Sequence, residues 1–172
     1  EMCIRDRLFI VSFLWGGSFL FIRLLVLEGM EPLEIVSMRM LLASIFILPF
    51  LLNRSKKHSF KDHSLSFLLI GILNTALPFT LFAYASLQLG AGSLSVLQAT
   101  VPILTALILF SLFKNEFSIF KLIGVLIGFV GLYVLVGPGS NFDLFSSILC
   151  VIASLSYSVA GVYLARTPNK LN

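Results

Sequence analysis

Two arginines stand inside long apolar stretches of the chain, where a charge needs either a partner or a route to water. Arg23 lies four residues from the end of the stretch 8–27, roughly 6 Å deep, so its guanidinium can reach the lipid headgroups. Arg39 lies six residues inside the stretch 33–52, roughly 9 Å deep, where cations usually face a cavity or a partner. We expect Arg39 to serve a site, and the two arginines together would attract an anion such as a ligand carboxylate or Glu34.

Two amide side chains each precede a proline by four residues: Asn74 precedes Pro78, and Gln98 precedes Pro102. Proline removes the hydrogen bond to the carbonyl four residues back. In lipid, a carbonyl freed in this way must be satisfied by protein, water or ligand. Two interpretations are left open: these groups line a binding site, or a neighbouring Ser or Thr repairs each kink. Tyr84, further along the same stretch as Asn74, would add a hydrogen-bonding wall.

A break of small residues, Trp15-Gly16-Gly17-Ser18, lies at the middle of the first apolar stretch. Small residues let a neighbouring helix approach closely, or they leave open space. A buried indole needs a partner for its N–H group. We give equal weight to cavity lining and to helix packing as the role of this break.

A stripe of glycines marks the stretch 119–136, at Gly124, Gly128 and Gly131. The spacing of the first two is the G-x-x-x-G pattern that lets membrane helices approach closely. We therefore predict a packing role for this stripe and no part in chemistry.

The composition sets the solvent in which these residues must work. The chain has 172 residues, of which 58% are hydrophobic and 12% charged, with 17 Phe and a net charge of +4. Soluble proteins are about a quarter charged, and a water-soluble core of this size cannot hide so much apolar surface. Lipid is the expected partner. The basic residues occur in short connectors, which is typical of membrane orientation rather than of nucleic-acid binding.

Six segments are long and apolar enough to cross a bilayer core of roughly 30 Å as helices. They are 8–27, 33–52, 65–86, 93–113, 119–136 and 144–165. We predict an all-α fold, a polytopic bundle of transmembrane helices. The connectors are short, so neighbouring helices should form antiparallel hairpins.

The charges of the connectors predict how the chain is oriented. One side carries eight basic residues: Arg54, Lys56, Lys57, Lys61, Lys114, Lys121, Arg166 and Lys170. The connectors on the other side contain no Lys or Arg, and they carry Glu28, Glu31, Glu34 and Asp143. The positive-inside rule therefore places the N-terminus in the cytoplasm.

Catalytic and metal-binding patterns are missing from the sequence. There is no G-x-S-x-G, H-E-x-x-H, P-loop or dinucleotide motif. Ser18 follows two glycines, but no intramembrane histidine can activate it. His58 and His63 share one polar connector, while Cys3 and Cys150 are far apart. We expect a protein that is not an enzyme and that holds no metal or other cofactor.

The last stretch repeats features of the first. Residues 154–166 read SLSYSVAGVYLAR and residues 12–23 read SFLWGGSFLFIR, each with an aromatic residue, small residues and then an arginine. If the last stretch opens a second unit, the first unit holds five spans. An odd number of spans inverts the next copy across the membrane, as in the inverted repeats of many secondary transporters.

Several of these features, taken in order, resemble an EamA-type repeat of the drug/metabolite transporter superfamily. They are WGGSF followed by Arg23, Arg39 early in the second stretch, Pro102 in the fourth, and Glu116 followed by the glycine stripe. Tyr157 departs from the pattern, because this family often has Trp at that point of its sixth helix.

The resemblance also divides the chain. Residues 8–137 look like one five-helix repeat, and residues 138–172 look like the start of a second repeat that is truncated here. Six spans would then be present of ten, arranged as five plus five in an inverted repeat. Residues 1–7, EMCIRDR, resemble a translated adapter remnant, and we expect them to be non-native.

The resemblance implies a secondary transporter of bacterial inner membranes, often a permease for efflux of amino acids or other small metabolites by alternating access. It implies a central cavity bounded by the first four helices of each repeat. Proton exchange and facilitated diffusion are both left open as the mode of transport. We expect the substrate path to be lined by Trp15, Ser18, Arg39, Asn74 and Gln98, with lesser roles for Arg23 and Tyr84.

Two alternatives compete with this interpretation. A sugar-phosphate or nucleotide-sugar carrier would use Arg23 and Arg39 to hold phosphate. A non-transporting membrane scaffold subunit would instead turn both arginines toward protein partners or headgroups and would lack an open path.

Overall fold

The computed structural model describes residues 4–52, 64–112, 119–136 and 143–166, and this part of the chain is helical throughout apart from turns. Its elements are α1 (Ile4–Leu27), α2 (Pro32–Leu52), α4 (Ser64–Gly71), the π-helical turn η1 (Ile72–Ala76), α5 (Leu77–Ala85), α6 (Ala91–Gln98), α7 (Val101–Leu112), α8 (Ile119–Val136) and α9 (Leu144–Arg166). The predicted all-α fold is confirmed.

Five helical spans of the described residues are long and apolar enough to cross a membrane. They are Ile4–Leu27, Pro32–Phe50, Ser64–Ala85, Ala91–Leu112 and Leu144–Arg166, and each matches a predicted segment within four residues or fewer. The remaining predicted segment, 119–136, coincides with α8. The fold is therefore that of a multi-pass membrane protein. Helix α1 begins at Ile4, inside the stretch 1–7 that we expected to be non-native.

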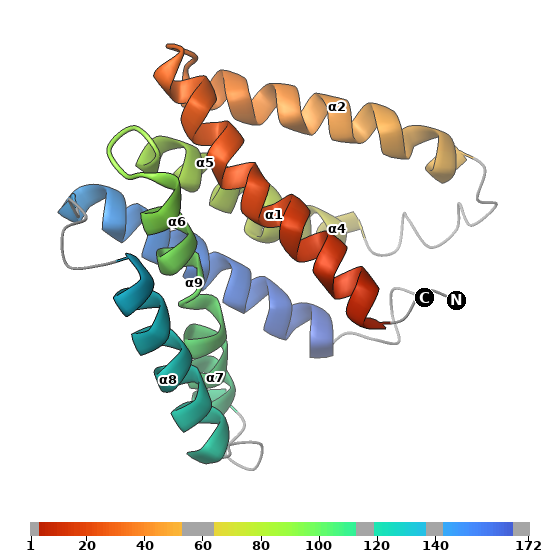
Figure 1. Cartoon of the computed structure of the whole chain (residues 1–172). Helices are drawn as coiled ribbons and strands as arrows, with labels where there is room; N and C mark the ends of the chain where they lie inside the picture. The colour runs from red at the N-terminus through yellow and green to blue at the C-terminus, as the bar shows by residue number, and fades with distance from the viewer. Residues whose placement is uncertain (1–3, 53–63, 113–118, 137–142, 167–172) are drawn as a thin grey trace.

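Helix α9 lies at the centre of the bundle, although it comes last in the sequence. It packs against η1, α5, α6 and α7, and Figure 1 shows it crossing the middle of the molecule between the α1–α2 pair and the α7–α8 pair. In the most apolar window of each span, 44% of the α9 residues are buried, against 6% in α1. Helix α9, the first helix after the predicted five-helix repeat, thus packs at the centre of the helices of that repeat.

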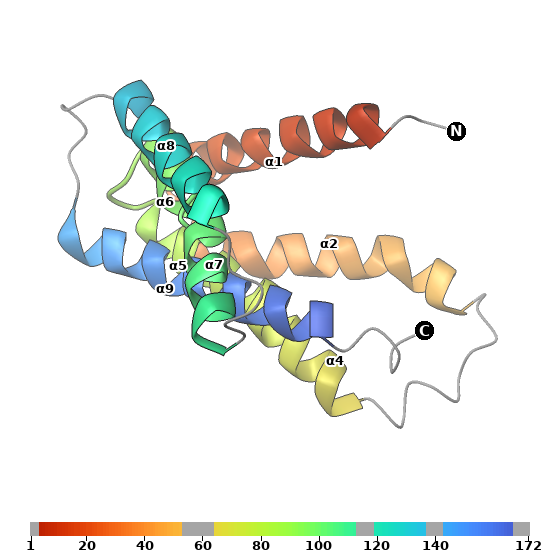
Figure 2. The ribbon, with the colours of Figure 1, turned by 90° about the horizontal axis from the view of Figure 1, so that it is seen from below.

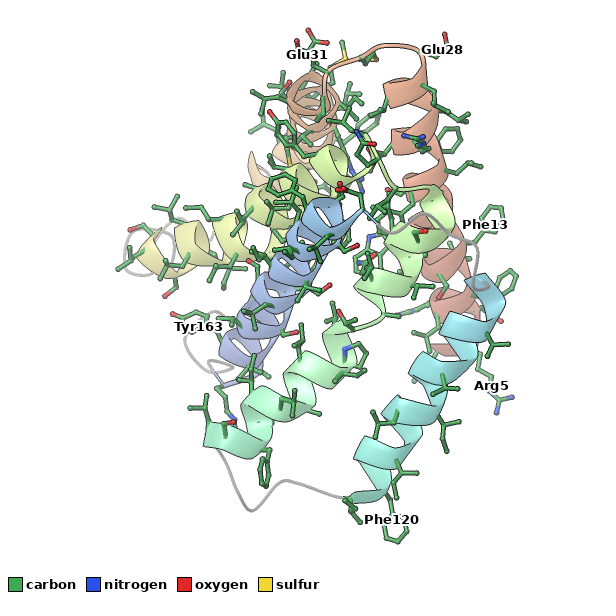
Figure 3. The ribbon with its side chains drawn as sticks, turned by 90° about the vertical axis from the view of Figure 1, so that its left-hand side faces the viewer. Arg5, Phe13, Glu28, Glu31, Phe120 and Tyr163 are labelled. Carbon is green, nitrogen blue, oxygen red and sulfur yellow. The ribbon has the colours of Figure 1, made fainter. Side chains whose placement is uncertain are left out.

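Helices α1 and α2 form an antiparallel hairpin, as predicted from their short connector. The turn between them contains Gly29, whose φ of 91° suits glycine. Figure 2 shows the two helices extending to the same side of the molecule. Figure 3 places Glu28 and Glu31 at one end of the bundle and Phe120, near the start of α8, at the opposite end.

Two clusters of buried side chains hold the bundle together. The larger cluster joins α5, the turn after it, α6 and α9, through Phe82, Ala85, Leu89, Leu94, Cys150, Ala153 and Tyr157. The smaller cluster joins α1, α2 and α5, through Ile22, Ile35, Val36 and Ala83. Phe79, which contacts Arg39, packs against both clusters, so they support the surroundings of this arginine.

The two prolines that follow amide residues interrupt their spans. Before Pro78 the helix widens into η1, and the Leu77 N–H bonds to the Ile72 carbonyl, five residues back. Before Pro102 the span divides into α6 and α7, with a turn at residues 99–100. Both predicted spans are therefore broken helices, because proline cannot continue the regular ladder of hydrogen bonds.

The glycine stripe of α8 makes no close contact among the described residues. A Cβ atom added at Gly124, Gly128 or Gly131 meets no atom within 4 Å. The predicted close packing is thus not found within the described part of the chain. Arg54, Lys56, Lys57, Lys61, His58, His63, Lys114, Glu116, Lys170 and Cys3, on which other predictions depend, lie outside the described residues.

Candidate functional site

A cavity of about 780 Å³ opens between α1, η1, α6, α7 and α9. Most of its lining is apolar, and its polar groups come from helices distant in sequence. The lining residues are Ser12, Trp15, Gly16, Phe19, Asn74, Ser95, Gln98, Ala99, Val101, Pro102 and Tyr157. A space of this size is within the range that binds small organic molecules.

A second cavity, of about 10 Å³, adjoins the first and has room for about one water molecule. The two cavities share Trp15, Phe19, Gln98 and Tyr157, so they are contiguous. The small cavity is further lined by Ser18, Ile22, Arg39, Phe79 and Phe82. The structure therefore brings four of the predicted site residues, Trp15, Ser18, Arg39 and Gln98, around one small recess.

Arg39 is held at this recess by α1 and α5. Its Nη1 donates a hydrogen bond of 2.8 Å to Ser18 Oγ, and its Cζ lies 4.2 Å from the centre of the Phe79 ring. An aromatic face attracts a cation most strongly where water is excluded. These two contacts orient the guanidinium and leave its remaining N–H groups available, because no other hydrogen bond from it occurs among the described residues.

Tyr157 lines the recess and is surrounded by aromatic rings. The ring centres of Trp15, Phe79 and Phe82 lie 6.5, 6.4 and 6.4 Å from that of Tyr157. The Tyr157 side chain is only 8% exposed, and its hydroxyl has no hydrogen-bond partner within the described part of the chain. A buried hydroxyl of this kind is rare in proteins, and a bound ligand or water would satisfy it.

The break of small residues in α1 borders the larger cavity. Gly16 lines this cavity, and a Cβ atom added there meets nothing within 4 Å among the described residues. The side chain of Trp15 is 51% exposed and lines both cavities. Gly16 and Trp15 therefore lie at the wall of the larger cavity, and no atom of a neighbouring helix packs on Gly16 among the described residues.

Asn74, Gln98 and Pro102 line the larger cavity, as the spacing of amide and proline suggested. Serines of α9 satisfy carbonyls one residue before each amide. Ser156 Oγ donates to the Leu73 carbonyl at 2.7 Å, and Ser154 Oγ donates to the Leu97 carbonyl at 3.1 Å. These bonds reach the carbonyls next to those of Asn74 and Gln98, which are the ones four residues before each proline. They therefore hold α9 against both broken helices, while Asn74 and Gln98 lie in the cavity wall.

Three other predicted residues lie away from the cavities. Arg23 Nη1 donates hydrogen bonds to the carbonyls of Ser86 and Leu87, where α5 ends, and Arg23 lines neither cavity. Arg23 therefore does not share an anion site with Arg39 in the structure, although the sequence had suggested that the two would meet. Tyr84 is 42% exposed and also lines neither cavity. Pro78 is fully buried, so it shapes the helix without reaching the recess.

The sequence-based site omitted Tyr157, Phe79 and Phe82. Aromatic residues are common throughout this chain, so their type alone does not single them out. Tyr157 did carry a signal, since it stands in the repeated pattern of residues 154–166 at a point comparable to Trp15. The ring centres of these two residues lie 6.5 Å apart in the structure.

Comparisons with a family model and with curated proteins agree on one family. The EamA-like transporter family matches residues 7–137. The Uncharacterized inner membrane transporter YedA of Escherichia coli K12 is 32% identical over 162 residues, covering 92% of this chain and 52% of the relative. The Uncharacterized transporter YdfC of Bacillus subtilis is 32% identical over 156 residues, covering 89% of this chain and 50% of the relative.

A more distant relative, an Uncharacterized transporter of Archaeoglobus fulgidus, is 28% identical over 144 residues, covering 83% of this chain and 44% of the relative. No solved structure gives a significant match. The chain spans about half the length of the curated relatives that it matches. The family match covers most of the chain, and the resemblance found in the sequence is confirmed: the chain belongs to the EamA-like transporter family.

Proposed function

We propose that this chain forms one half of a secondary-active transporter of small organic metabolites, such as amino acids, in a bacterial inner membrane. The observation that carries the proposal is the continuous cavity lined by Trp15, Asn74, Gln98 and Tyr157, with Arg39 at its recess. Polar groups around open space in an apolar bundle are costly in lipid unless they serve a ligand or an ion. The names of the relatives, all uncharacterized transporters, support the same general function.

Alternating access follows from the proposed repeat. In this proposal residues 8–137 form the first repeat, and a second, inverted repeat begins within residues 138–172. Helix α9 would then be the first helix of the second repeat. Its packing against η1, α5, α6 and α7 supports this, since inverted-repeat transporters place their sites where the repeats meet. Transport of this kind needs no catalytic group, and the proposal assigns none.

The competing functions explain less of the geometry. A scaffold subunit needs no cavity, although the contact of Arg23 with the carbonyls of Ser86 and Leu87 is of the kind expected for a scaffold. A carrier of sugar phosphates would gain from two arginines at one site. Arg23 binds those carbonyls instead, so of these two arginines it is Arg39 that lines the recess. Transport of a small metabolite with at most one negative charge fits this arrangement better.

The experiment uses the intact transporter that contains this chain, reconstituted in liposomes and screened by counterflow against a panel of metabolites. We expect accumulation of at least one member of the panel. Arg39→Gln should lower its initial rate about ten-fold or more, because a charge-assisted contact is lost. Arg23→Gln is the matched control, and it should keep most of the rate because Arg23 lines neither cavity.

Absence of counterflow for every compound, with correctly inserted protein, would reject transport and favour the scaffold. An equal loss of counterflow rate in both arginine variants would show that Arg39 has no specific role in the substrate path. Insertion is checked by recovery of the protein from the membrane fraction, so a folding defect is separated from a transport defect.

A further inference from the structure

Arg39 has no negative partner in its surroundings. It is the single cation that lines the two cavities, and no acidic side chain lines them, among the residues that the structure describes. Its contacts are the neutral hydroxyl of Ser18 and the ring of Phe79. A half-buried cation in lipid without a counter-charge is unfavourable, so an anion bound beside it would offset that cost.

The hydroxyl of Tyr157 is a second group that lacks a partner at the same recess. It is buried and makes no hydrogen bond among the described residues, and its side chain lines the small cavity together with Arg39 and Ser18. A phenol hydroxyl donates one hydrogen bond. A donor that lacks an acceptor and a cation that lacks an anion thus meet at one place, and a carboxylate oxygen would satisfy both.

The two cavities differ in size, so a ligand that occupies both would have a small polar head and a larger body. The small one, of about 10 Å³, has room for roughly one polar atom, and the larger one, of about 780 Å³, accommodates the rest. Trp15 and Phe19 line both, so an apolar or aromatic body would lie against their rings. Gln98 also lines both, and Asn74 lines the larger one, so amide groups are available for polar substituents of the body.

We propose that the ligand of this site is a small organic monocarboxylate with an apolar or aromatic body. One carboxylate oxygen lies between the Arg39 guanidinium and the Tyr157 hydroxyl, and the body occupies the larger cavity beside Trp15. This inference rests on the proposed transport function and narrows its substrate class, from small metabolites such as amino acids to carboxylic acids that carry no amine. The proposed site is more specific than a general metabolite site, because one arginine and one tyrosine together bind the carboxylate.

Other charge types fit the same cavities less well. A phosphate monoester carries a second negative charge, whereas Arg23, the other nearby arginine, is engaged with the carbonyls of Ser86 and Leu87. An amine would place a positive charge beside Arg39. A free amino acid would bring an ammonium group, for which the described lining offers amide and hydroxyl oxygens but no carboxylate. The site therefore favours a carboxylic acid without an amine.

The test is a binding measurement on the purified chain in detergent micelles. Trp15 is the sole tryptophan of the chain and lines both cavities, so its fluorescence reports occupancy. Four ligands share one phenyl body: phenylpropionate, phenylalanine, phenylpropylamine and phenyl phosphate. We expect saturable quenching by phenylpropionate, with affinity about ten-fold or more above that of the other three.

Two matched pairs of variants locate the carboxylate. Arg39→Gln should weaken phenylpropionate binding about ten-fold or more, whereas Arg23→Gln should leave it unchanged. Tyr157→Phe should weaken it about five-fold, whereas Tyr84→Phe, at a residue that lines neither cavity, should leave it unchanged. Thermal unfolding of each variant in the same detergent confirms that the fold is kept.

Equal or tighter binding of phenylalanine, phenylpropylamine or phenyl phosphate would overturn the inference. So would unchanged affinity in Arg39→Gln, or absence of binding by all four ligands. None of these results bears on counterflow by the intact transporter, so the proposed function can hold while the carboxylate assignment fails. Conversely, binding without any transport would reject the function and keep the assignment.

Discussion

Arg39 Nη1 of helix α2 donates a hydrogen bond of 2.8 Å to Ser18 Oγ of helix α1, across the hairpin that these helices form. The bond joins the cation of the second span to the small-residue break of the first. It gives Ser18, which follows two glycines at the middle of a span, a role: its hydroxyl accepts a hydrogen bond from the arginine at the wall of the recess.

We expect Ser18→Ala to loosen Arg39 without removing its charge. Loss of this neutral acceptor should cost about 1 kcal/mol, equivalent to about a five-fold weaker affinity for the anionic ligand, measured by fluorescence of Trp15. Ser44→Ala is the control, because Ser44 Oγ donates to the Met40 carbonyl of its own helix at an exposed position. An affinity unchanged in Ser18→Ala would show that the Phe79 ring alone positions the guanidinium.

The serines of α9 should stabilise the broken helices. Ser156 Oγ donates to the Leu73 carbonyl in η1 at 2.7 Å, so Ser156→Ala leaves that carbonyl with one partner fewer in lipid. Such interhelical bonds contribute about 0.6 kcal/mol on average and up to about 1.7 kcal/mol in membrane proteins. We expect a loss of stability in this range, measured by unfolding in mixed micelles of increasing denaturing detergent.

The matched control for that measurement is Ser111→Ala. Ser111 Oγ donates to the Leu107 carbonyl of its own helix at an exposed position, so its removal breaks no contact between helices. A loss of stability that is equal in both variants would contradict a special role for α9 in holding η1.

The start of α9 should respond to acid. Asp143 accepts a hydrogen bond of 2.8 Å from the Ser146 N–H, and this bond lowers the pKa of the Asp143 carboxyl below its ordinary value of 3.8. A lowered pKa in the folded state means that the stabilisation is fully present above about pH 3.8 and is lost as the pH falls through the folded pKa.

Amide exchange at Ser146 measures this effect. Its protection factor should fall at pH values below the folded pKa of Asp143, with a smaller change in Asp143→Asn, because asparagine caps the helix without titrating. Equal acid sensitivity in both proteins would assign the effect to another group.

The predicted orientation can be checked at the α1–α2 turn. Glu28 and Glu31 lie at the end of the bundle opposite Phe120 (Figure 3), and the positive-inside rule places this turn outside the cytoplasm. In intact cells, a cysteine introduced by Glu28→Cys should react with a membrane-impermeant maleimide. A cysteine introduced by Ser55→Cys, in the basic connector, should react only after the cells are opened. The reverse pattern would invert the topology.

The sequence alone determined the helices and their environment. A membrane span must satisfy its own backbone hydrogen bonds within about 20 apolar residues, so its position is a local property. The predicted segments accordingly match the observed helices, and proline explains locally why two spans are broken at η1 and between α6 and α7. Polarity within apolar spans had singled out Trp15, Asn74 and Gln98, and the structure places all three in the lining of one cavity.

Only the tertiary structure decided which charges share a site. The sequence suggested that Arg23 and Arg39 together attract one anion, yet packing turns Arg23 to the end of α5 and Arg39 to the recess. Tyr157 completes the recess from a helix more than a hundred residues after Arg39, and its unsatisfied hydroxyl follows from the rings around it. Direction around a helix and distance between helices are set by packing of the whole bundle, which the local sequence does not contain.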